Sequence, residues 1–323
     1  MDFEAFVAEW HNDDPCVVVH TSGSTGAPKP LMVEKRRMEA SARITCHFLG
    51  LRRGDAALLC LPLDYIAGKM MVVRAITCGL NLIRVEPSGH PLAQVDAPID
   101  FAAMVPMQVA NSLKVADERE KLRAIKHLII GGGAILPDLE QELKDFPGAV
   151  WSTYGMTETL SHIALRRLNG NEASRWYTPF SGVRVSLDSR GCLVIDAPMV
   201  CEQQLVTNDC AELSDNGFRI LGRIDNVVCS GGIKIQIEEV EQALKPHMTA
   251  PFIITKKHDP ILGEALTLLT EAHNTDEVAQ ICQRFLPKYH QPRHIYHIHQ
   301  VPYTETGKPA RSKAKAIATS LTR

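Results

Sequence analysis

The first half of the chain alternates short apolar runs with segments whose apolar residues recur at helical spacing. The run Cys16–Val19 predicts a strand, whereas the positions from Met38 to Leu49 repeat every three or four residues and predict a helix. Further strands are predicted at 56–61, 82–85, 101–105, 128–130 and 150–152, and further helices at 68–78, 106–115 and 137–146. This alternation is typical of an α/β fold with a mostly parallel sheet.

The second half of the chain changes to a pattern of period two. From Gly182 to Ile220 apolar and polar residues alternate, which predicts a β-rich subdomain over about 180–222. Helical spacing returns at Ile237 and is followed by a strand pair, a helix over 278–285, a strand and a terminal helix. We therefore expect a large N-terminal domain at 1–224 and a small α+β domain at 225–323.

The bulk composition narrows the class of protein. A chain of 323 residues, 45% hydrophobic and 22% charged, is long enough for two folded domains. The net charge of -2 gives no reason to expect a nucleic-acid partner. No apolar stretch is long enough to span a membrane, and the acidic N-terminus lacks a signal-peptide pattern, so we expect a cytoplasmic protein. The nine cysteines form no C-x-x-C pair and are expected to be reduced.

A segment rich in hydroxyls and glycine follows the first apolar run and is a candidate for phosphate binding. Glycine lets the backbone approach an anion, the hydroxyls donate hydrogen bonds, and a lysine supplies positive charge. The candidate residues are Thr21, Ser22, Gly23, Ser24, Thr25, Gly26 and Lys29. The spacing of the glycines is not that of the common nucleotide P-loop, and such a cluster is also typical of a solvated turn.

Two other polar segments follow predicted strands, at 131–134 and 154–159. Ligands of open α/β sheets bind beyond the carboxyl ends of the strands. We therefore expect the segment at 21–29 and these two segments to converge on one edge of the sheet.

Five motifs then occur in a recognisable order, at 21–29, 154–159, 222–225, 230–241 and 302–308. On these motifs the chain resembles the acyl-adenylate-forming (AMP-binding) family of acyl-CoA synthetases, luciferases and peptide-synthetase adenylation domains. Among the subfamilies it is most similar to the 2-succinylbenzoate-CoA ligases of menaquinone biosynthesis. The resemblance covers nearly the whole chain and implies ATP, Mg²⁺ and coenzyme A as cofactor and substrates.

The resemblance assigns the nucleotide contacts to particular residues. It implies that the loop 21–29 wraps the leaving phosphates, that Tyr154 stacks on adenine, that Thr157 binds the adenylate phosphate and that Glu158 holds magnesium. The implied wall of the adenine site consists of Gly133 and Ala134, and Gly132 and Gly155 are further implied adenine- or ribose-binding residues. Without the other motifs, the segment 154–159 is equally a strand end followed by a helix-capping threonine.

Asp209 and Arg223 match the family's ribose ligands, since a carboxylate accepts from vicinal hydroxyls and a guanidinium donates in a fixed fork. The alternative for Asp209 is a turn aspartate. The residue before it departs from the family, which usually has glycine where this chain has Asn208.

The resemblance gives the C-terminal domain the role of a mobile lid. Lys308 matches the lysine that bridges the acyl carboxylate and the α-phosphate during adenylation, although alone it is an ordinary tail lysine. Asp225 matches the hinge about which that domain rotates. Ser230, Gly231 and Gly232 would face the coenzyme A tunnel in the rotated state, and the glycine pair is also consistent with a plain turn.

The acyl pocket must be inferred from the residues alone. Arg74 lies within the apolar helix 68–78, where a charge needs a partner, and a second substrate carboxylate would serve. Lys69 on the same helix and His162 beyond the 154–159 motif are competing candidates. The alternatives for Arg74 are a snorkelling side chain or an internal salt bridge.

The predicted function is an ATP-dependent acid–CoA ligase that acts on a carboxylic acid, with 2-succinylbenzoate as the favoured substrate. The alternatives are a ligase for another aryl or short acid, an adenylation enzyme that acylates a carrier protein, and an inactive nucleotide-binding homologue. Only twenty residues precede the 21–29 loop, which suggests a shortened member of the family. A second subunit of a homodimer is one way to close its pocket.

Overall fold

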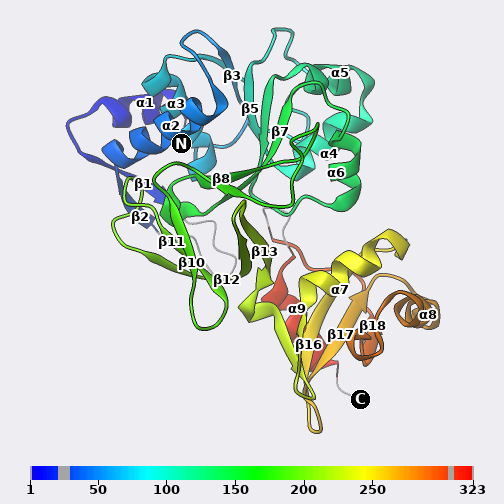
Figure 1. Ribbon diagram of the computed structural model, residues 1–323. Helices are drawn as coiled ribbons and strands as arrows, with labels where there is room; N and C mark the ends of the chain where they lie inside the picture. The colour runs from blue at the N-terminus through cyan, green and yellow to red at the C-terminus, as the bar shows by residue number, and fades with distance from the viewer. Residues whose placement is uncertain (1, 21–29, 305–308, 322–323) are drawn as a thin grey trace. The chain divides into compact units, whose positions relative to one another are not determined.

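The computed structural model describes residues 2–20, 30–304 and 309–321 (Figure 1). The chain divides into two compact units. The first contains Met1–Ser186, Val194–Val206 and Leu213–Arg219, and the second contains Leu187–Leu193, Thr207–Glu212 and Ile220–Arg323. Among the described residues, every helix is too short or too polar to cross a membrane.

A seven-stranded sheet forms the centre of the first unit, in the order β4-β3-β5-β6-β7-β8-β9. Its strands are β3 (Ala56–Leu59), β4 (Asn81–Arg84), β5 (Phe101–Met104), β6 (His127–Ile130), β7 (Ala149–Gly155), β8 (His162–Arg167) and β9 (Thr178–Pro179). The strands from β4 to β7 are parallel, and β8 and β9 are antiparallel to their neighbours. The predicted α/β class with a mostly parallel sheet is therefore confirmed.

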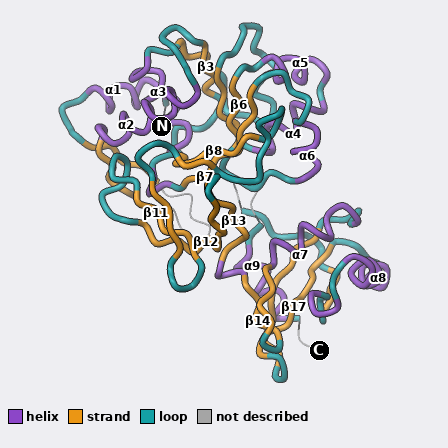
Figure 2. Tube along the Cα trace, in the orientation of Figure 1, coloured by secondary structure: helices purple, strands orange, loops and turns teal. Residues whose placement is uncertain are grey.

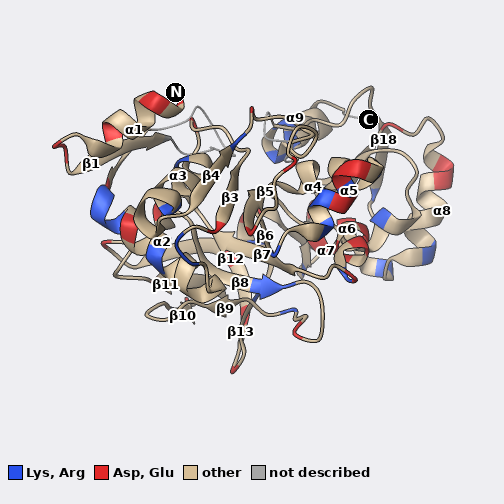
Figure 3. Cartoon of the chain, turned by 90° about the horizontal axis from the view of Figure 1, so that it is seen from above, with Lys and Arg blue, Asp and Glu red and all other residues tan. Residues whose placement is uncertain are grey.

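Helices cover both faces of this sheet, with α2 and α3 on one side and α4, α5 and α6 on the other (Figures 1 and 2). They are α2 (Lys35–Leu49), α3 (Ile66–Cys78), α4 (Pro106–Lys114), α5 (Ala116–Ala124) and α6 (Pro137–Leu143). All four residues of β5 are buried, as expected for a strand with helices on both faces. The charged residues of α5 have both signs (Figure 3), and only Glu118 and Leu122 of that helix are buried.

The strand before the 21–29 segment does not belong to the large sheet. β1 (Cys16–His20) pairs antiparallel with β2 (Pro30–Glu34) in a sheet of two strands. The 21–29 segment itself lies outside the described residues, so its convergence with the other two segments stays a prediction. What the structure corrects is the sheet to which β1 belongs. The reason is local, because β1 finds its partner in the next strand along the chain.

Side chains from two helices form hydrogen bonds with the backbone of β1 at Val18, on the side of the strand away from β2. Its N–H donates to Glu9 Oε1 of α1 (Phe3–His11) at 3.4 Å, and its carbonyl accepts from Lys69 Nζ of α3 at 2.7 Å. These groups satisfy backbone atoms that a third strand would otherwise pair.

A sheet of four strands follows in the order β10-β11-β12-β13. Its strands are β10 (Arg184–Leu187), β11 (Cys192–Asp196), β12 (Leu205–Ser214) and β13 (Gly217–Arg223). These four strands occupy the segment for which the period-two pattern predicts β structure.

The C-terminal part of the second unit is built on a five-stranded sheet. Its strands are β14 (Val227–Ser230), β15 (Ile233–Gln236), β16 (Phe252–Asp259), β17 (Gly263–Thr270) and β18 (His294–His297). Its helices are α7 (Ile237–Leu244), α8 (Thr275–Phe285) and α9 (Arg311–Ser320), with short 3₁₀ turns at Ile224–Asn226, Lys245–His247 and Lys288–His290. Adjacent strand residues face opposite layers, since Ile254 packs with α7 and α8 whereas Ile253 packs with α9.

Candidate active site

Two candidate segments lie next to each other at the carboxyl ends of β6 and β7. The two strands are parallel neighbours, with Ile130 opposite Ser152, so residues 131–134 and 154–159 leave the sheet at the same edge. The structure therefore brings these two predicted segments together, as the strand-end argument requires.

The ring of Tyr154 is held from one side by aromatic residues. Its centroid lies 5.0 Å from that of Phe218 in an edge-on arrangement and 5.8 Å from that of Tyr177. Tyr177 is itself fixed by a hydrogen bond of 2.8 Å between its hydroxyl and Ser152 Oγ. Tyr154 is half-buried, so the cluster holds an aromatic ring of the kind on which a flat heterocycle can stack.

A tight turn after β7 carries Thr157 and Glu158. The turn is a 3₁₀ helix (Thr157–Thr159) in which the Met156 N–H donates to Thr159 Oγ1 at 2.9 Å. The Cys201 thiol donates to the Glu158 carbonyl at 3.3 Å. Leu160 follows with φ 64°, the one positive φ at a non-glycine residue in the described chain. A strained backbone conformation persists only where the surrounding structure holds it in place. Here the side-chain contacts of Thr159 and Cys201 hold the turn that precedes Leu160.

Few side chains at this turn could bind a metal ion. Within the described residues no three histidine, cysteine or acidic side chains gather into a ligand group. Glu158 is exposed and offers one carboxylate. A single carboxylate suits magnesium, which is commonly held by one or two carboxylates together with substrate phosphates.

Gly155 allows β7 to approach β8 closely. A Cβ at this position would lie 2.3 Å from the Ser161 carbonyl oxygen and 2.5 Å from His162 Cα. The pairing of the two strands also shifts register between Tyr154 and Gly155. Any larger residue would push the turn with Thr157 and Glu158 away from β8.

Arg74 is buried in the first unit, and none of the described acidic residues pairs with it. Its side chain donates from Nη2 to Ser161 Oγ at 2.6 Å, and its residue is 2% exposed. Its Nε has no hydrogen-bond partner in the described part of the chain, and the thiols of Cys46 and Cys78 act on its charge only through space. Burial lowers the pKa of Arg74 to about 10, so the guanidinium remains charged near neutral pH. Neither a snorkelling side chain nor a salt bridge to a described residue accounts for it.

Ser161 joins Arg74 to His162. Ser161 Oγ lies 3.2 Å from His162 Nδ1, and His162 Nε2 lies 3.2 Å from Thr45 Oγ1 on α2. Burial, and then the nearby Arg74 charge, hold the pKa of His162 well below its ordinary value. His162 is therefore neutral and serves as a hydrogen-bonding group. An apolar pocket that includes Ile44, Phe180 and Val200 reaches the same histidine.

Lys69 lies on the same helix but is engaged elsewhere. Its Nζ donates to the Val18 carbonyl and lies 5.1 Å from the centre of the Phe6 ring. Burial lowers the pKa of Lys69, with Glu9 and Asp64 opposing that shift. This geometry gives Lys69 a place in supporting β1, whereas Arg74 is a buried cation with no acidic partner among the residues that the structure describes.

The sequence predictions did not include the residues that hold Arg74 and His162. Thr45 and Ser161 lie 117 and 87 residues from the groups that they contact. Ser161 stands directly between the 154–159 motif and His162, and this adjacency was the one signal available in the sequence.

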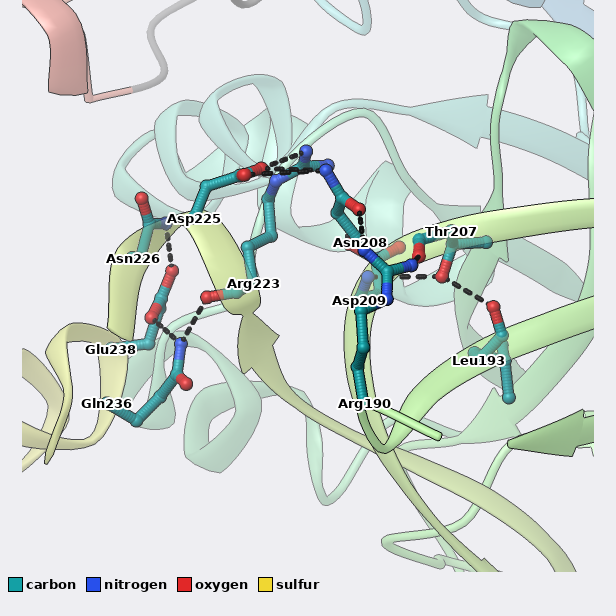
Figure 4. A network of polar contacts seen from close by, with 10 residues as sticks. All are labelled: Arg190, Leu193, Thr207, Asn208, Asp209, Arg223, Asp225, Asn226, Gln236 and Glu238. Atoms are coloured by element: carbon teal, nitrogen blue, oxygen red, sulfur yellow. Dashed lines mark hydrogen bonds and ion pairs between the residues drawn. The ribbon is translucent and has the colours of Figure 1, made fainter. Parts of the chain in front are cut away.

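In the second unit Asp209, Arg223 and Asp225 form one cluster (Figure 4). Arg223 Nη1 lies 3.5 Å from Asp209 Oδ1, and Arg223 Nη2 lies 2.7 Å from Asp225 Oδ2. The Arg223 hydrogen bond is the main cause that lowers the pKa of Asp225. The structure thus brings together the predicted ribose pair and the predicted hinge residue.

Gly231 and Gly232 form the turn between β14 and β15. Ser230 pairs with Ile233, so the two glycines are the whole connection, and their φ angles of 57° and 86° are those of a two-residue hairpin turn. The turn geometry by itself accounts for both glycines. The predicted phosphate loop Thr21–Lys29 and the predicted catalytic Lys308 lie outside the described residues.

The parallel sheet with helices on both faces, and a Tyr-Gly-x-Thr-Glu turn at its carboxyl edge, define an α/β ligand-binding enzyme. The family model for the AMP-binding enzyme matches residues 4–195, so the chain belongs to the AMP-binding enzyme family. Within that family it is an adenylate-forming acid–CoA ligase.

Similar proteins agree with this placement. A crystal structure of an AMP-forming acyl-CoA synthetase/AMP-acid ligase II-like protein from Dyadobacter fermentans is 35% identical, with 97% of this chain and 92% of that chain covered and a TM-score of 0.67. The 2-succinylbenzoate–CoA ligase of a Geobacillus species is 24% identical over 97% of this chain and 71% of its own length. The O-succinylbenzoate coenzyme A synthetase of Bacillus subtilis, solved with ATP and a magnesium ion, shares the fold at 21% identity over 92% of this chain and 69% of that chain, with a TM-score of 0.77.

Proposed function

We propose that the protein activates 2-succinylbenzoate with ATP and transfers the acyl group to coenzyme A, releasing AMP and pyrophosphate. The observation that carries the choice of acid is Arg74, a buried cation without a described carboxylate partner. The name of the Geobacillus relative supports the same acid. A dicarboxylate leaves one carboxylate for the reaction and a second one for this guanidinium.

The resemblance supports assigning the nucleotide contacts to residues of each cluster taken by itself. Tyr154 and residues Gly132–Ala134 would contact adenine, and Thr157 would donate to the adenylate phosphate. Asp209 would accept from the ribose hydroxyls, and Arg223, which lies 3.5 Å from it, would donate to them. Glu158 would hold magnesium, which neutralises phosphate charge when bound.

The reaction would proceed in two balanced steps. The substrate carboxylate oxygen attacks the α-phosphorus of ATP, forming an acyl–phosphate bond while the bond to pyrophosphate breaks. The sulfur of coenzyme A then attacks the acyl carbon, its proton is lost, and AMP leaves with the bonding electron pair. We place Lys308 beside the α-phosphate in the first step, and the loop Thr21–Lys29 around the leaving pyrophosphate. Rotation about Asp225 would separate the two steps, with residues 230–232 on the coenzyme A side.

The cost of burying the Arg74 guanidinium is a physical argument for a dicarboxylate substrate. A charge removed from water without a counter-ion is costly, and a bound carboxylate would offset that cost. Ser161 and His162 would hold the guanidinium in place, since they form a continuous polar contact from α3 to α2.

The deciding experiment follows pyrophosphate and thioester separately, using purified protein, ATP, magnesium and coenzyme A with a panel of acids. We expect 2-succinylbenzoate to release pyrophosphate and to yield a thioester, and benzoate to be a poor substrate. Pyrophosphate release without thioester would favour transfer to a carrier protein. The absence of pyrophosphate with every acid would overturn the proposed ligase, and a preference for monocarboxylates would remove the role given to Arg74.

A further inference from the structure

Asn208 occupies a position between two groups of the proposed nucleotide site (Figure 4). Its Nδ2 lies 3.4 Å from Asp225 Oδ1 and 3.3 Å from Asp225 Oδ2. Its Oδ1 accepts from Arg190 Nη1 at 3.1 Å. The chemistry of the partners fixes the orientation of the amide, since only the NH₂ group can donate to a carboxylate and only the oxygen can accept from a guanidinium.

Arg190 forms a fixed support behind Asn208. Its guanidinium donates from Nε to Asp188 Oδ2 at 2.8 Å and from Nη2 to the Thr207 carbonyl at 3.0 Å. The Asp188 carboxylate also accepts from the backbone N–H groups of Arg190 and Cys192, at 2.8 and 3.0 Å. The side of Asn208 that faces Arg190 is therefore held by the turn between β10 and β11.

The other side of Asn208 faces the connection between β13 and β14. Asp225 lies in the 3₁₀ turn Ile224–Asn226, and its carboxylate also accepts from Arg223 Nη2. The backbone of β12 near Asn208 has its own anchors, because Asp209 N donates to Thr207 Oγ1 at 3.1 Å and that hydroxyl donates to the Leu193 carbonyl at 2.7 Å. The β12 backbone at this point is therefore anchored by groups other than the Asn208 side chain, and that side chain connects the strand to Asp225.

We propose that Asn208 is a positioning residue that ties Asp225 to the strand carrying Asp209, and that it thereby sets the relative rates of the two half-reactions. The proposal rests on the proposed two-step ligase, in which Asp225 is the hinge. Rotation of the backbone at Asp225 would carry its carboxylate away from both Asn208 and Arg223. Each contact formed in only one of the two hinge conformations favours that conformation by its own free energy.

The experiment compares Asn208→Ala and Asn208→Asp with wild type and with Asn216→Ala, a control in the turn after β12. Pyrophosphate release reports the first half-reaction, and conversion of a preformed acyl-adenylate with coenzyme A reports the second. We expect the ratio of the two rates to change by at least about fivefold in Asn208→Ala, with a larger change in Asn208→Asp, where a second carboxylate faces Asp225. The control should keep the wild-type ratio.

A second readout does not depend on activity. Amide hydrogen exchange over residues 224–227 should be faster in both Asn208 variants than in wild type, with an unchanged melting temperature. An unchanged ratio of the two rates together with unchanged amide exchange would overturn the proposal that Asn208 holds Asp225. Equal losses of rate in both half-reactions with a lowered melting temperature would overturn it as well. If wild type releases no pyrophosphate with any acid, the proposed ligase fails, while the exchange measurement still decides whether Asn208 holds Asp225.

Discussion

Arg74 illustrates how a single residue can reveal a ligand. Arg74 is 2% exposed, its guanidinium donates to Ser161 Oγ and lies near the Met71 sulfur, and its Nε has no described partner. The sequence pointed to this residue because a charge interrupts an apolar helix. It could not reveal Ser161 as the partner, because that contact depends on how α3 packs against the start of β8.

Replacing Arg74 with methionine should separate stability from activity. Removal of a buried charge without a counter-ion should leave the free energy of unfolding unchanged or raise it by about 1–3 kcal/mol. The value of kcat/KM for 2-succinylbenzoate should fall by about 30-fold or more, the loss expected when a buried ion pair with substrate is removed. Urea unfolding and steady-state kinetics give the two quantities.

The matched control for this experiment is Arg43→Met on α2, since Arg43 is 65% exposed and pairs with Glu39. It should alter neither quantity, because exposed ion pairs contribute little. A strong loss of stability in Arg74→Met would instead mean that the guanidinium serves the fold.

His162 should make stability depend on pH in a definite direction. Its pKa in the folded state lies well below the ordinary 6.5, so the unfolded chain binds a proton that the folded chain does not as pH falls through 6.5. Its neutral form therefore favours folding at pH 7, and stability falls below pH 6.5 by up to about 1.4 kcal/mol per pH unit. Urea unfolding at pH 7.5 and 5.5 measures the difference.

A His162→Gln variant should show a smaller loss of stability over that pH interval. Burial also lowers the pKa of His127, so some of the pH dependence should persist in the variant. Equal pH dependence in wild type and variant would exclude His162 as a source.

Among the elements, those with a clear apolar period were predictable and those without one were not. The strands of the parallel sheet and the helices α2, α3 and α4 follow from apolar runs and helical spacing. The helix α5 was missed because its sequence is mostly charged and only two of its residues are buried. The strand β2 was missed because it forms by pairing with β1. The spacing of apolar residues within β2 gives no sign of that pairing.

The turn between β7 and β8 should tolerate no side chain at position 155. Gly155→Ala would place a Cβ 2.3 Å from the Ser161 carbonyl oxygen, so we expect a loss of about 1–3 kcal/mol in the free energy of unfolding. Gly133→Ala is the matched comparison, since its Cβ would lie 3.7 Å from Pro106 Cγ, an ordinary contact. Urea unfolding of both variants tests this, and a stable Gly155→Ala protein would show that β8 can move aside.

At the scale of the whole molecule, the proposed chemistry divides between two compact units. Asp209, Arg223 and Asp225 belong to the second unit, whereas Tyr154, Glu158 and Arg74 belong to the first. The motif resemblance pointed to Tyr154, Glu158, Asp209, Arg223 and Asp225, whereas Arg74 was inferred from the apolar helix that carries it. The sequence could not predict that Asn208 reaches Asp225, because that contact requires the turn after β13 to lie against β12.

Lys308→Ala should distinguish the two half-reactions of the proposed ligase. Loss of its charge should slow pyrophosphate release by about 100-fold or more, the size seen when one group that stabilises transition-state charge is removed. Conversion of a preformed acyl-adenylate to thioester should stay within about twofold of wild type, because no pyrophosphate leaves in that step. Lys315→Ala on α9 is the control, and equal slowing of both steps by Lys308→Ala would contradict the assigned role.

The side chains of Glu9 and Lys69 at Val18 have a consequence for how the protein behaves in a crowded solution. A strand with unpaired amides and carbonyls along its outer side is a template on which another chain can add a strand. In β1 the outward N–H and carbonyl of Val18 are already bonded, the first to a carboxylate and the second to an ammonium. Lys69, a candidate substrate ligand in the sequence, thus removes at Val18 a backbone carbonyl with which a strand of another chain could pair.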